Sequence, residues 1–121
     1  MADTVILRIP ADTGRVRIAR LVAAAIADDI GFDLDEIDDL RLAVDELCFA
    51  LLDAGESEAI EIVVGVDGDT VEVTGSCTYA GPPSAVELGT LAAQLLGAVV
   101  DTHEVGLQEG EGRFRLRKRR T

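Results

Sequence analysis

The residue type best suited to chemistry in this chain is a carboxylate on an apolar helix. Glu46 follows Asp45 within Ile37–Asp53. The apolar positions of that stretch recur at the three- and four-residue spacing of a helix with one buried face (Ile37, Leu40, Val44, Leu47, Cys48 and Leu51). At least one of the two carboxylates is therefore expected at the rim of the core. A carboxylate there can accept a proton from a neighbouring molecule; the alternative is a surface carboxylate that only aids solubility.

Other reactive residue types lack the partners that catalysis or metal binding needs. His103 has no cysteine or carboxylate at ligand spacing, so we expect neither a metal site nor nucleophilic catalysis there. Cys48 and Cys77 also lack metal-ligand spacing. We interpret both as free thiols in a reducing cytoplasm. No signal peptide or membrane span is recognisable, which also favours a cytoplasmic protein.

The basic residues fall into two clusters on a chain of formal net charge -12. That charge argues against nucleic-acid binding, which needs a basic footprint. Arg15, Arg17 and Arg20 form the early cluster, either a solvated face or a contact patch for an acidic partner. The late cluster alternates with apolar residues, which predicts arginines on an open sheet face, paired with carboxylates or serving solubility (Arg113, Arg115 and Arg117).

The pattern of elements predicts one α+β domain over residues 1–121. Strands are expected over 4–9, 59–66, 70–75, 103–108 and 113–118, and helices over the Asp12–Gly31 region, 37–53 and 85–100. The first strand, bounded by Pro10, is predicted at an edge. Strands and helices in this order make a two-layer α/β sandwich, with a mostly antiparallel sheet and three helices on one face. The predicted inward residues are Ile60, Ile62, Val64, Val71 and Val73.

A family resemblance enters at DLRLAVDELCFALLDAG, with a helix before it and a hairpin after it. This segment resembles the N-box of the GHKL (histidine kinase-like) ATPase superfamily, and most closely that of the RsbW-type serine-kinase anti-sigma factors. ELGTLAAQLLGAVVDTHEV is similar to the family's later glycine motif, and GEGRFRLRKRR to its closing strand. The resemblance implies the GHKL fold, a catalytic role for Glu46 and nucleotide-binding positions at Gly75 and Gly89.

Three departures from the family pattern concern the nucleotide. The family's magnesium-binding Asn, four residues after the Glu, is Ala50 here. Its adenine-binding Asp after the second hairpin strand has no counterpart between Val73 and Gly81, and its long lid is reduced to a short loop. We therefore expect weak or lost ATP binding and serine-kinase activity, no metal ligands and no resident cofactor. ATP and magnesium would bind only if the degenerate site still works.

The resemblance also implies partners. In the family, an arginine early in the first helix contacts the sigma factor, and the same surface meets a STAS-type anti-anti-sigma factor. Arg15 lies at the matching position, with Arg17 nearby. A homodimer is implied in the same way. Three interpretations stay open: a sigma-factor regulator acting by binding and partner switching, an active ATP-dependent kinase of a STAS serine, or an adaptor of the same fold that binds neither sigma factor nor nucleotide.

Overall fold

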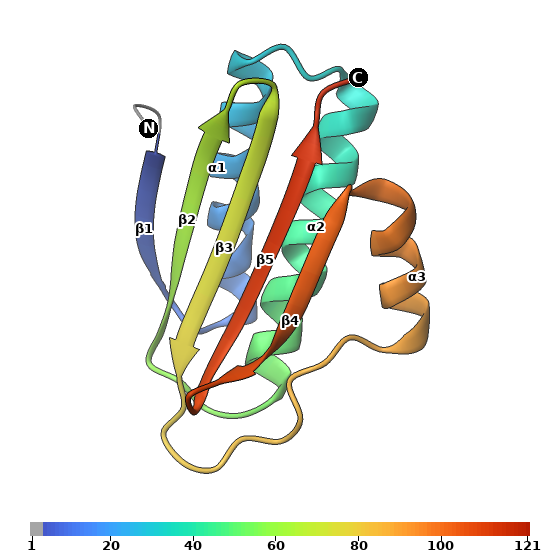
Figure 1. Cartoon of the computed structure of the whole chain (residues 1–121). Helices are drawn as coiled ribbons and strands as arrows, with labels where there is room; N and C mark the ends of the chain where they lie inside the picture. Colours follow the sequence, from blue (N-terminus) through green and yellow to red (C-terminus); the bar gives the residue numbers. More distant parts are fainter. Residues whose placement is uncertain (1–3) are drawn as a thin grey trace.

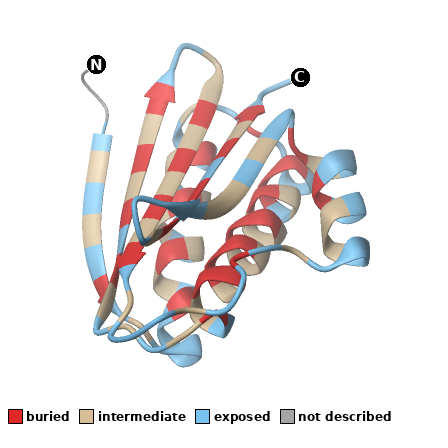
Figure 2. Cartoon of the chain, turned by 60° about the horizontal axis from the view of Figure 1, so that its bottom comes forward, coloured by how far each residue is buried: buried red, intermediate tan, exposed pale blue. Residues whose placement is uncertain are grey.

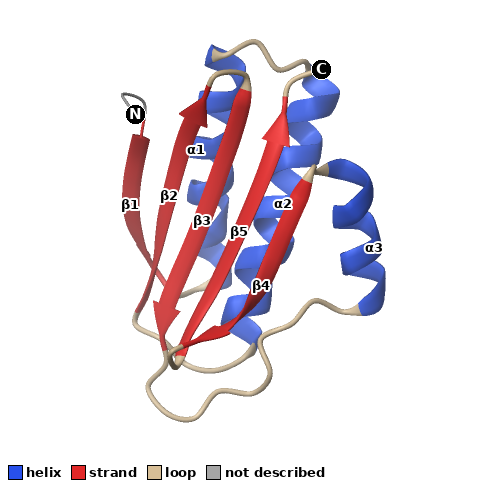
Figure 3. Cartoon of the chain, in the orientation of Figure 1, coloured by secondary structure: helices blue, strands red, loops and turns tan. Residues whose placement is uncertain are grey.

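The computed structural model describes residues 4–121, which form a five-stranded sheet with three α-helices on one side (Figures 1 and 3). The elements are β1 (Thr4–Pro10), the 3-10 turn η1 (Thr13–Arg15), α1 (Val16–Asp29), α2 (Leu34–Asp53), β2 (Ala59–Asp67), β3 (Thr70–Thr78), α3 (Thr90–Val99), β4 (Thr102–Gln108) and β5 (Glu111–Arg119). The strand order is β1-β2-β3-β5-β4, and every neighbouring pair is antiparallel. The predicted two-layer α+β fold is confirmed.

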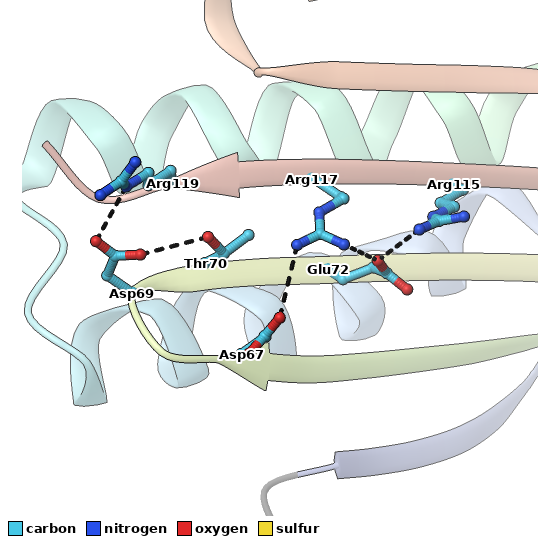
Figure 4. Close-up of polar contacts among 7 residues, drawn as sticks. All are labelled: Asp67, Asp69, Thr70, Glu72, Arg115, Arg117 and Arg119. Atoms are coloured by element: carbon cyan, nitrogen blue, oxygen red, sulfur yellow. Dashed lines mark hydrogen bonds and ion pairs between the residues drawn. The ribbon is translucent and has the colours of Figure 1, made fainter. Parts of the chain in front are cut away.

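The sheet divides cleanly into a covered and an open face because side chains alternate along each strand. All the predicted inward residues are buried, and Phe114 and Leu116 of β5 join them. β1 is an edge strand, as predicted, and β4 is the other edge. On the open face Arg115 and Arg117 of β5 both contact Glu72 of β3, at 3.2 and 3.1 Å (Figure 4). Arg113 pairs with Glu111 of its own strand, at 2.6 Å. The predicted pairing of these arginines is therefore observed.

The helix α1 packs through small residues. Its fully buried stripe is Ala19, Ala23 and Ala27. The apolar spacing of the sequence predicts a shared face for Ile18, Leu21, Val22, Ala25 and Ile26, of which Ile18, Val22 and Ile26 are partly buried against the core. Leu21 is more than half exposed. The predicted face is therefore confirmed in part: Leu21 and Ala25 are exposed, and the most deeply buried positions are alanines because a close approach between two helices leaves room only for small side chains at the line of contact.

Four element boundaries differ from the predicted ones. The helix α2 begins at Leu34, three residues early, because Asp33 and Glu36 form a reciprocal capping box. The strand β3 continues to Thr78, since its ladder with β5 reaches Glu111. The last hairpin turns at Glu109 and Gly110 alone, both with positive φ. The helix α3 covers only Thr90–Val99, because the residues before it run extended from a loop fastened to the end of α2.

The burial pattern shows where the core lies. Buried residues concentrate on β2, β3 and β5 and on the sides of α1 and α2 that face them, whereas α3 is largely exposed or half-buried (Figure 2). Within residues 4–121, no helix combines the length and apolar character needed to cross a membrane.

Candidate functional site

Glu46 lies on the side of α2 that is turned toward α3. Residues 39, 43, 46, 50 and 53 follow the three- and four-residue spacing of one helical face. The ammonium of Lys118 fixes the direction of this face: it donates a 2.6 Å hydrogen bond to the Val99 carbonyl at the end of α3 and lies 3.9 Å from the Asp39 carboxylate. Glu46 is half-buried there, as expected of a carboxylate at the rim of the core.

Its neighbour Asp45 serves a different purpose. Successive helical residues are turned by about 100°, so Asp45 points toward α1. There its carboxylate accepts a 2.8 Å hydrogen bond from the Arg20 guanidinium and forms an ion pair with it. Of the early arginines, Arg20 is therefore the one that contacts α2. No local spacing in the sequence could have predicted this pair, because its two residues are 25 positions apart.

The position where the resemblance places a magnesium ligand offers no oxygen donor. Ala50 is buried one turn beyond Glu46 on the same face. Within residues 4–121 no group of three or more histidines, cysteines and carboxylates is arranged to hold a metal ion. The residue one turn beyond Glu46 therefore cannot help its carboxylate to hold a cation.

The end of β3, where the family places its adenine-binding Asp, is apolar on its covered side. Cys77 is the last buried residue of the strand. Cys48 of α2 is fully buried, and burial raises the pKa of its thiol to about 12, to which the charge of Asp45 and the nearby Cys77 also contribute. Both thiols are free, as predicted, and the raised pKa keeps the Cys48 thiol protonated at neutral pH.

The loop after β3 is fastened onto the C-terminal end of α2. The hydroxyl of Tyr79 donates a 2.6 Å hydrogen bond to the Leu51 carbonyl in the last turn of the helix, which also accepts a 3.4 Å hydrogen bond from the Ala54 N–H. Two backbone hydrogen bonds join the same segments, from Ala80 N–H to the Glu56 carbonyl (2.8 Å) and from Ser84 N–H to the Ala54 carbonyl (2.6 Å). Burial is the first cause that raises the pKa of Tyr79. Sequence reasoning missed Tyr79, which carried no signal beyond its place in a Gly- and Pro-containing loop.

The two glycines predicted to bind nucleotide occupy unlike positions. Gly75 lies on the covered face of β3 opposite Phe114, and a Cβ atom there would overlap the aromatic ring. Its lack of a side chain therefore has a packing reason. Gly89 precedes α3 with an extended backbone and open space around its Cα. Nothing in its surroundings requires glycine, and the nucleotide role of both residues stays a prediction.

Arg15 and Arg17 lie at the start of the first helix and are both exposed. Arg15 belongs to the 3-10 turn η1, which Asp12 caps by accepting a hydrogen bond from the Gly14 N–H at 3.0 Å. Arg17 follows in the first turn of α1. Both guanidinium groups are free to meet a partner, and the contact itself stays a prediction.

Two surface hollows lie away from Glu46. One, of about 690 Å³, is near the end of β3 and includes Arg8, Thr78 and Arg113 in its lining. The other, of about 640 Å³, includes Thr74, Glu104 and Arg115. Neither is lined by Glu46 or Ala50, so the carboxylate and these hollows do not form one site.

Comparisons with known proteins agree with this architecture. The profile of the histidine kinase-like ATPase domain matches residues 9–111. The serine-protein kinase RsbW of Bacillus licheniformis is 28% identical over 131 aligned residues, which cover 90% of this chain and 81% of the relative. The serine-protein kinase RsbW of Bacillus cereus (strain B4264) is 36% identical over 73 residues, or 55% of this chain and 44% of the relative. In that match the chain spans less than half the length of its relative.

A solved structure extends the likeness to nearly the whole chain. The RsbU and RsbW domains of a Mycobacterium tuberculosis protein match with a TM-score of 0.74 at 16% identity, over 98% of this chain and 33% of that one. At this identity the match concerns the fold. Because the family profile covers most of the sequence, the chain belongs to the histidine kinase-like ATPase domain family, within which it is similar to the RsbW-type serine-protein kinases.

Proposed function

We propose that this chain is an RsbW-type anti-sigma regulator that acts by binding a sigma factor and a STAS-type antagonist, with ATP binding and serine-kinase activity weak or lost. The observation that carries the proposal is the side of α2 that faces α3, where Glu46 remains and Ala50 replaces the expected magnesium ligand. Phosphoryl transfer depends on positioning and on metal-assisted charge stabilisation, and Glu46 alone supplies neither.

The fastening of the loop after β3 supports the same proposal. A nucleotide-binding loop must open and close around its ligand. Here the Tyr79 hydroxyl and two backbone N–H groups hold the loop on the end of α2 and the residues that follow it. Opening it would break three hydrogen bonds and expose the ring of a half-buried tyrosine. Each such bond contributes about 0.5–1.5 kcal/mol, so the opening would reduce the affinity for a nucleotide by that sum.

Calorimetric titration with a non-hydrolysable ATP analogue, with and without magnesium, tests the loss of nucleotide binding. The RsbW protein of Bacillus licheniformis serves as the comparison. We expect no saturable heat up to about 1 mM analogue, a concentration that corresponds to roughly −4 kcal/mol of binding free energy. Saturable, magnesium-dependent binding below that concentration would contradict the proposal.

Partner binding is tested at the start of the first helix. An arginine can form two parallel hydrogen bonds with a carboxylate of the sigma factor. The substitutions Arg15→Ala and Arg17→Ala are expected to weaken capture of the sigma factor about tenfold in a pull-down or by surface plasmon resonance. Arg8→Ala, which removes an exposed arginine from β1, is the matched control. Equal losses in all three variants would remove the assignment.

An active kinase is the second candidate, because Glu46 is half-buried and the relatives are called serine-protein kinases. Incubation with ATP, magnesium and a STAS-domain protein would then yield phosphoserine, and Glu46→Ala would abolish it. In the binding-only regulator no phosphoserine appears, and Glu46→Ala leaves capture of the sigma factor unchanged. A protein of this fold that captures neither partner nor nucleotide would be an adaptor instead.

A further inference from the structure

The helix α3 is apolar on nearly all sides but is covered on only one. Its sequence, TLAAQLLGAV, contains no charged residue, and Leu96 is its one buried residue. Leu91 is 69% exposed and Leu95 41% exposed, one turn apart on the outer side. A helix with apolar residues all round is normally buried, and neighbouring exposed leucines mark an interaction surface.

The adjoining side of α2 is acidic. Asp39, Glu46 and Asp53 share the helical face that Lys118 links to the end of α3. Lys118 leaves little positive charge for a partner, because its side chain is buried and its ammonium already contacts the Val99 carbonyl and Asp39. Glu46 and Asp53 have no ion-pair partner within residues 4–121.

This charge is part of a wider asymmetry in the sequence. Residues 42–112 contain no lysine and no arginine but 14 of the 23 acidic residues. They include the second half of α2, all of α3 and all of β4, so neither α3 nor this half of α2 carries a basic residue. A partner that covers them must bring apolar side chains together with positive charge.

We propose that the α2–α3 surface, defined by Glu46, Asp53, Leu91 and Leu95, binds a basic amphipathic helix of another protein. The apolar side of that helix packs on the two leucines, and its lysines or arginines pair with the acidic side of α2. This is the recognition mode in which an amphipathic helix lays its apolar side on an apolar surface of its partner. A second copy of this chain fits poorly, because it would bring the same uncompensated carboxylates to the contact.

The inference goes beyond the proposed regulatory function and shares only Glu46 with it, since Asp53, Leu91 and Leu95 have no part in that proposal. Arg15 and Arg17 would select an acidic partner surface, whereas the α2–α3 surface selects a basic one. Loss of one contact therefore leaves the other intact, and failure of either proposal is recognised separately.

The test uses a designed leucine–lysine amphipathic peptide of about five helical turns, roughly 18 residues. Its binding to the full chain is measured by fluorescence anisotropy, with a leucine–glutamate peptide of the same pattern for comparison. The double variant Leu91→Ser/Leu95→Ser is expected to bind the lysine peptide about tenfold more weakly. The matched control is Leu21→Ser/Leu34→Ser, which removes two leucines that are 53% and 80% exposed elsewhere on the surface.

A second pair of variants tests the charge. Glu46→Gln/Asp53→Asn is expected to weaken binding a few-fold and to reduce its dependence on salt, because both carboxylates face the peptide's lysines. Asp28→Asn/Asp29→Asn removes the same charge from the end of α1 as the control. Circular dichroism verifies that every variant is folded.

Three results would overturn the proposal. The first is an equal loss in the test and control variants, which would indicate unspecific attraction to an acidic protein. The second is equally tight binding of the glutamate peptide. The third is a dimer in light scattering that Leu91→Ser/Leu95→Ser makes monomeric, since a second copy would then cover α3.

Discussion

The helix α2 contacts the other two helices in different ways. Toward α1, the contact is close: the alanines at 19, 23 and 27 are fully buried, and one ion pair, between Arg20 and Asp45, lies at its edge. Toward α3, Leu96 is fully buried and Lys118 bridges to the Val99 carbonyl, while Leu91 and Leu95 remain exposed. One side of α2 therefore serves stability, and the other is available for binding.

The difference follows from the chemistry of each side. Small apolar residues allow two helices to approach until van der Waals contact is continuous, and nothing is left for a partner to bind. Acidic residues next to an uncharged helix prevent such closure, because a buried carboxylate needs a counter-ion. The same helix that carries Glu46 can thus belong to the rigid core on one side and to a functional surface on the other.

The largest expected effect comes from breaking the α1–α2 contact. Ala23→Leu places extra methylenes where no space exists and should lower the free energy of unfolding by about 1–3 kcal/mol. The loss of stability is measured by urea denaturation, with circular dichroism as the signal. The control is Ala98→Leu on the exposed side of α3, which should change stability by less than about 0.5 kcal/mol. Similar effects of the two substitutions would mean that the sides of α2 do not differ.

The next effect concerns the loop on α2. Tyr79→Phe removes the donor to the Leu51 carbonyl and should cost about 0.5–1.5 kcal/mol of stability at neutral pH. Burial raises the pKa of Tyr79, so the unfolded chain ionises before the folded one. The contribution of the Tyr79 hydroxyl to stability is therefore fully present below pH about 10 and is lost as the pH rises above that value. Denaturation at several alkaline pH values should show a shallower loss in the phenylalanine variant; identical slopes would exclude this role for Tyr79.

A smaller and more local effect is expected on the α3 side. Lys118→Met keeps the apolar stem but removes the donor to the Val99 carbonyl. We expect faster hydrogen exchange of α3 amides, with a change in global stability of about 1 kcal/mol or less. Exchange measured by mass spectrometry should leave α1 peptides unaffected. Equal acceleration in α1 and α3 would show that the two contacts open together.

The smallest effect should be that of the ion pair. A double-mutant cycle with Arg20→Ala and Asp45→Ala is expected to give a coupling of about 0.2–1 kcal/mol, because both side chains remain partly exposed. High salt should reduce it. A coupling well above this range would mean that the ion pair, and not the alanine stripe, holds α1 to α2.

Local sequence patterns were sufficient for most of the fold. The alternation in β2 and β3 predicted their inward residues, and the apolar spacing of α2 predicted its buried face and the rim position of Glu46. These features depend on residues within one element, because the backbone of a helix or strand repeats its side-chain directions at a fixed spacing along the sequence. The replacement of the expected metal ligand by Ala50 is likewise visible in the sequence alone.

Only the tertiary structure decided how closely the elements approach one another. Three observations depend on segments that are far apart in the chain: the buried alanines of α1, the hydrogen bond from Tyr79 to the Leu51 carbonyl, and the ion pair between Arg20 and Asp45. The length of α3 was also decided in this way, since the loop before it is held by the end of α2. Hydrogen bonds and packing between distant segments override local propensity wherever the two compete, and no pattern within one segment records the distance to another.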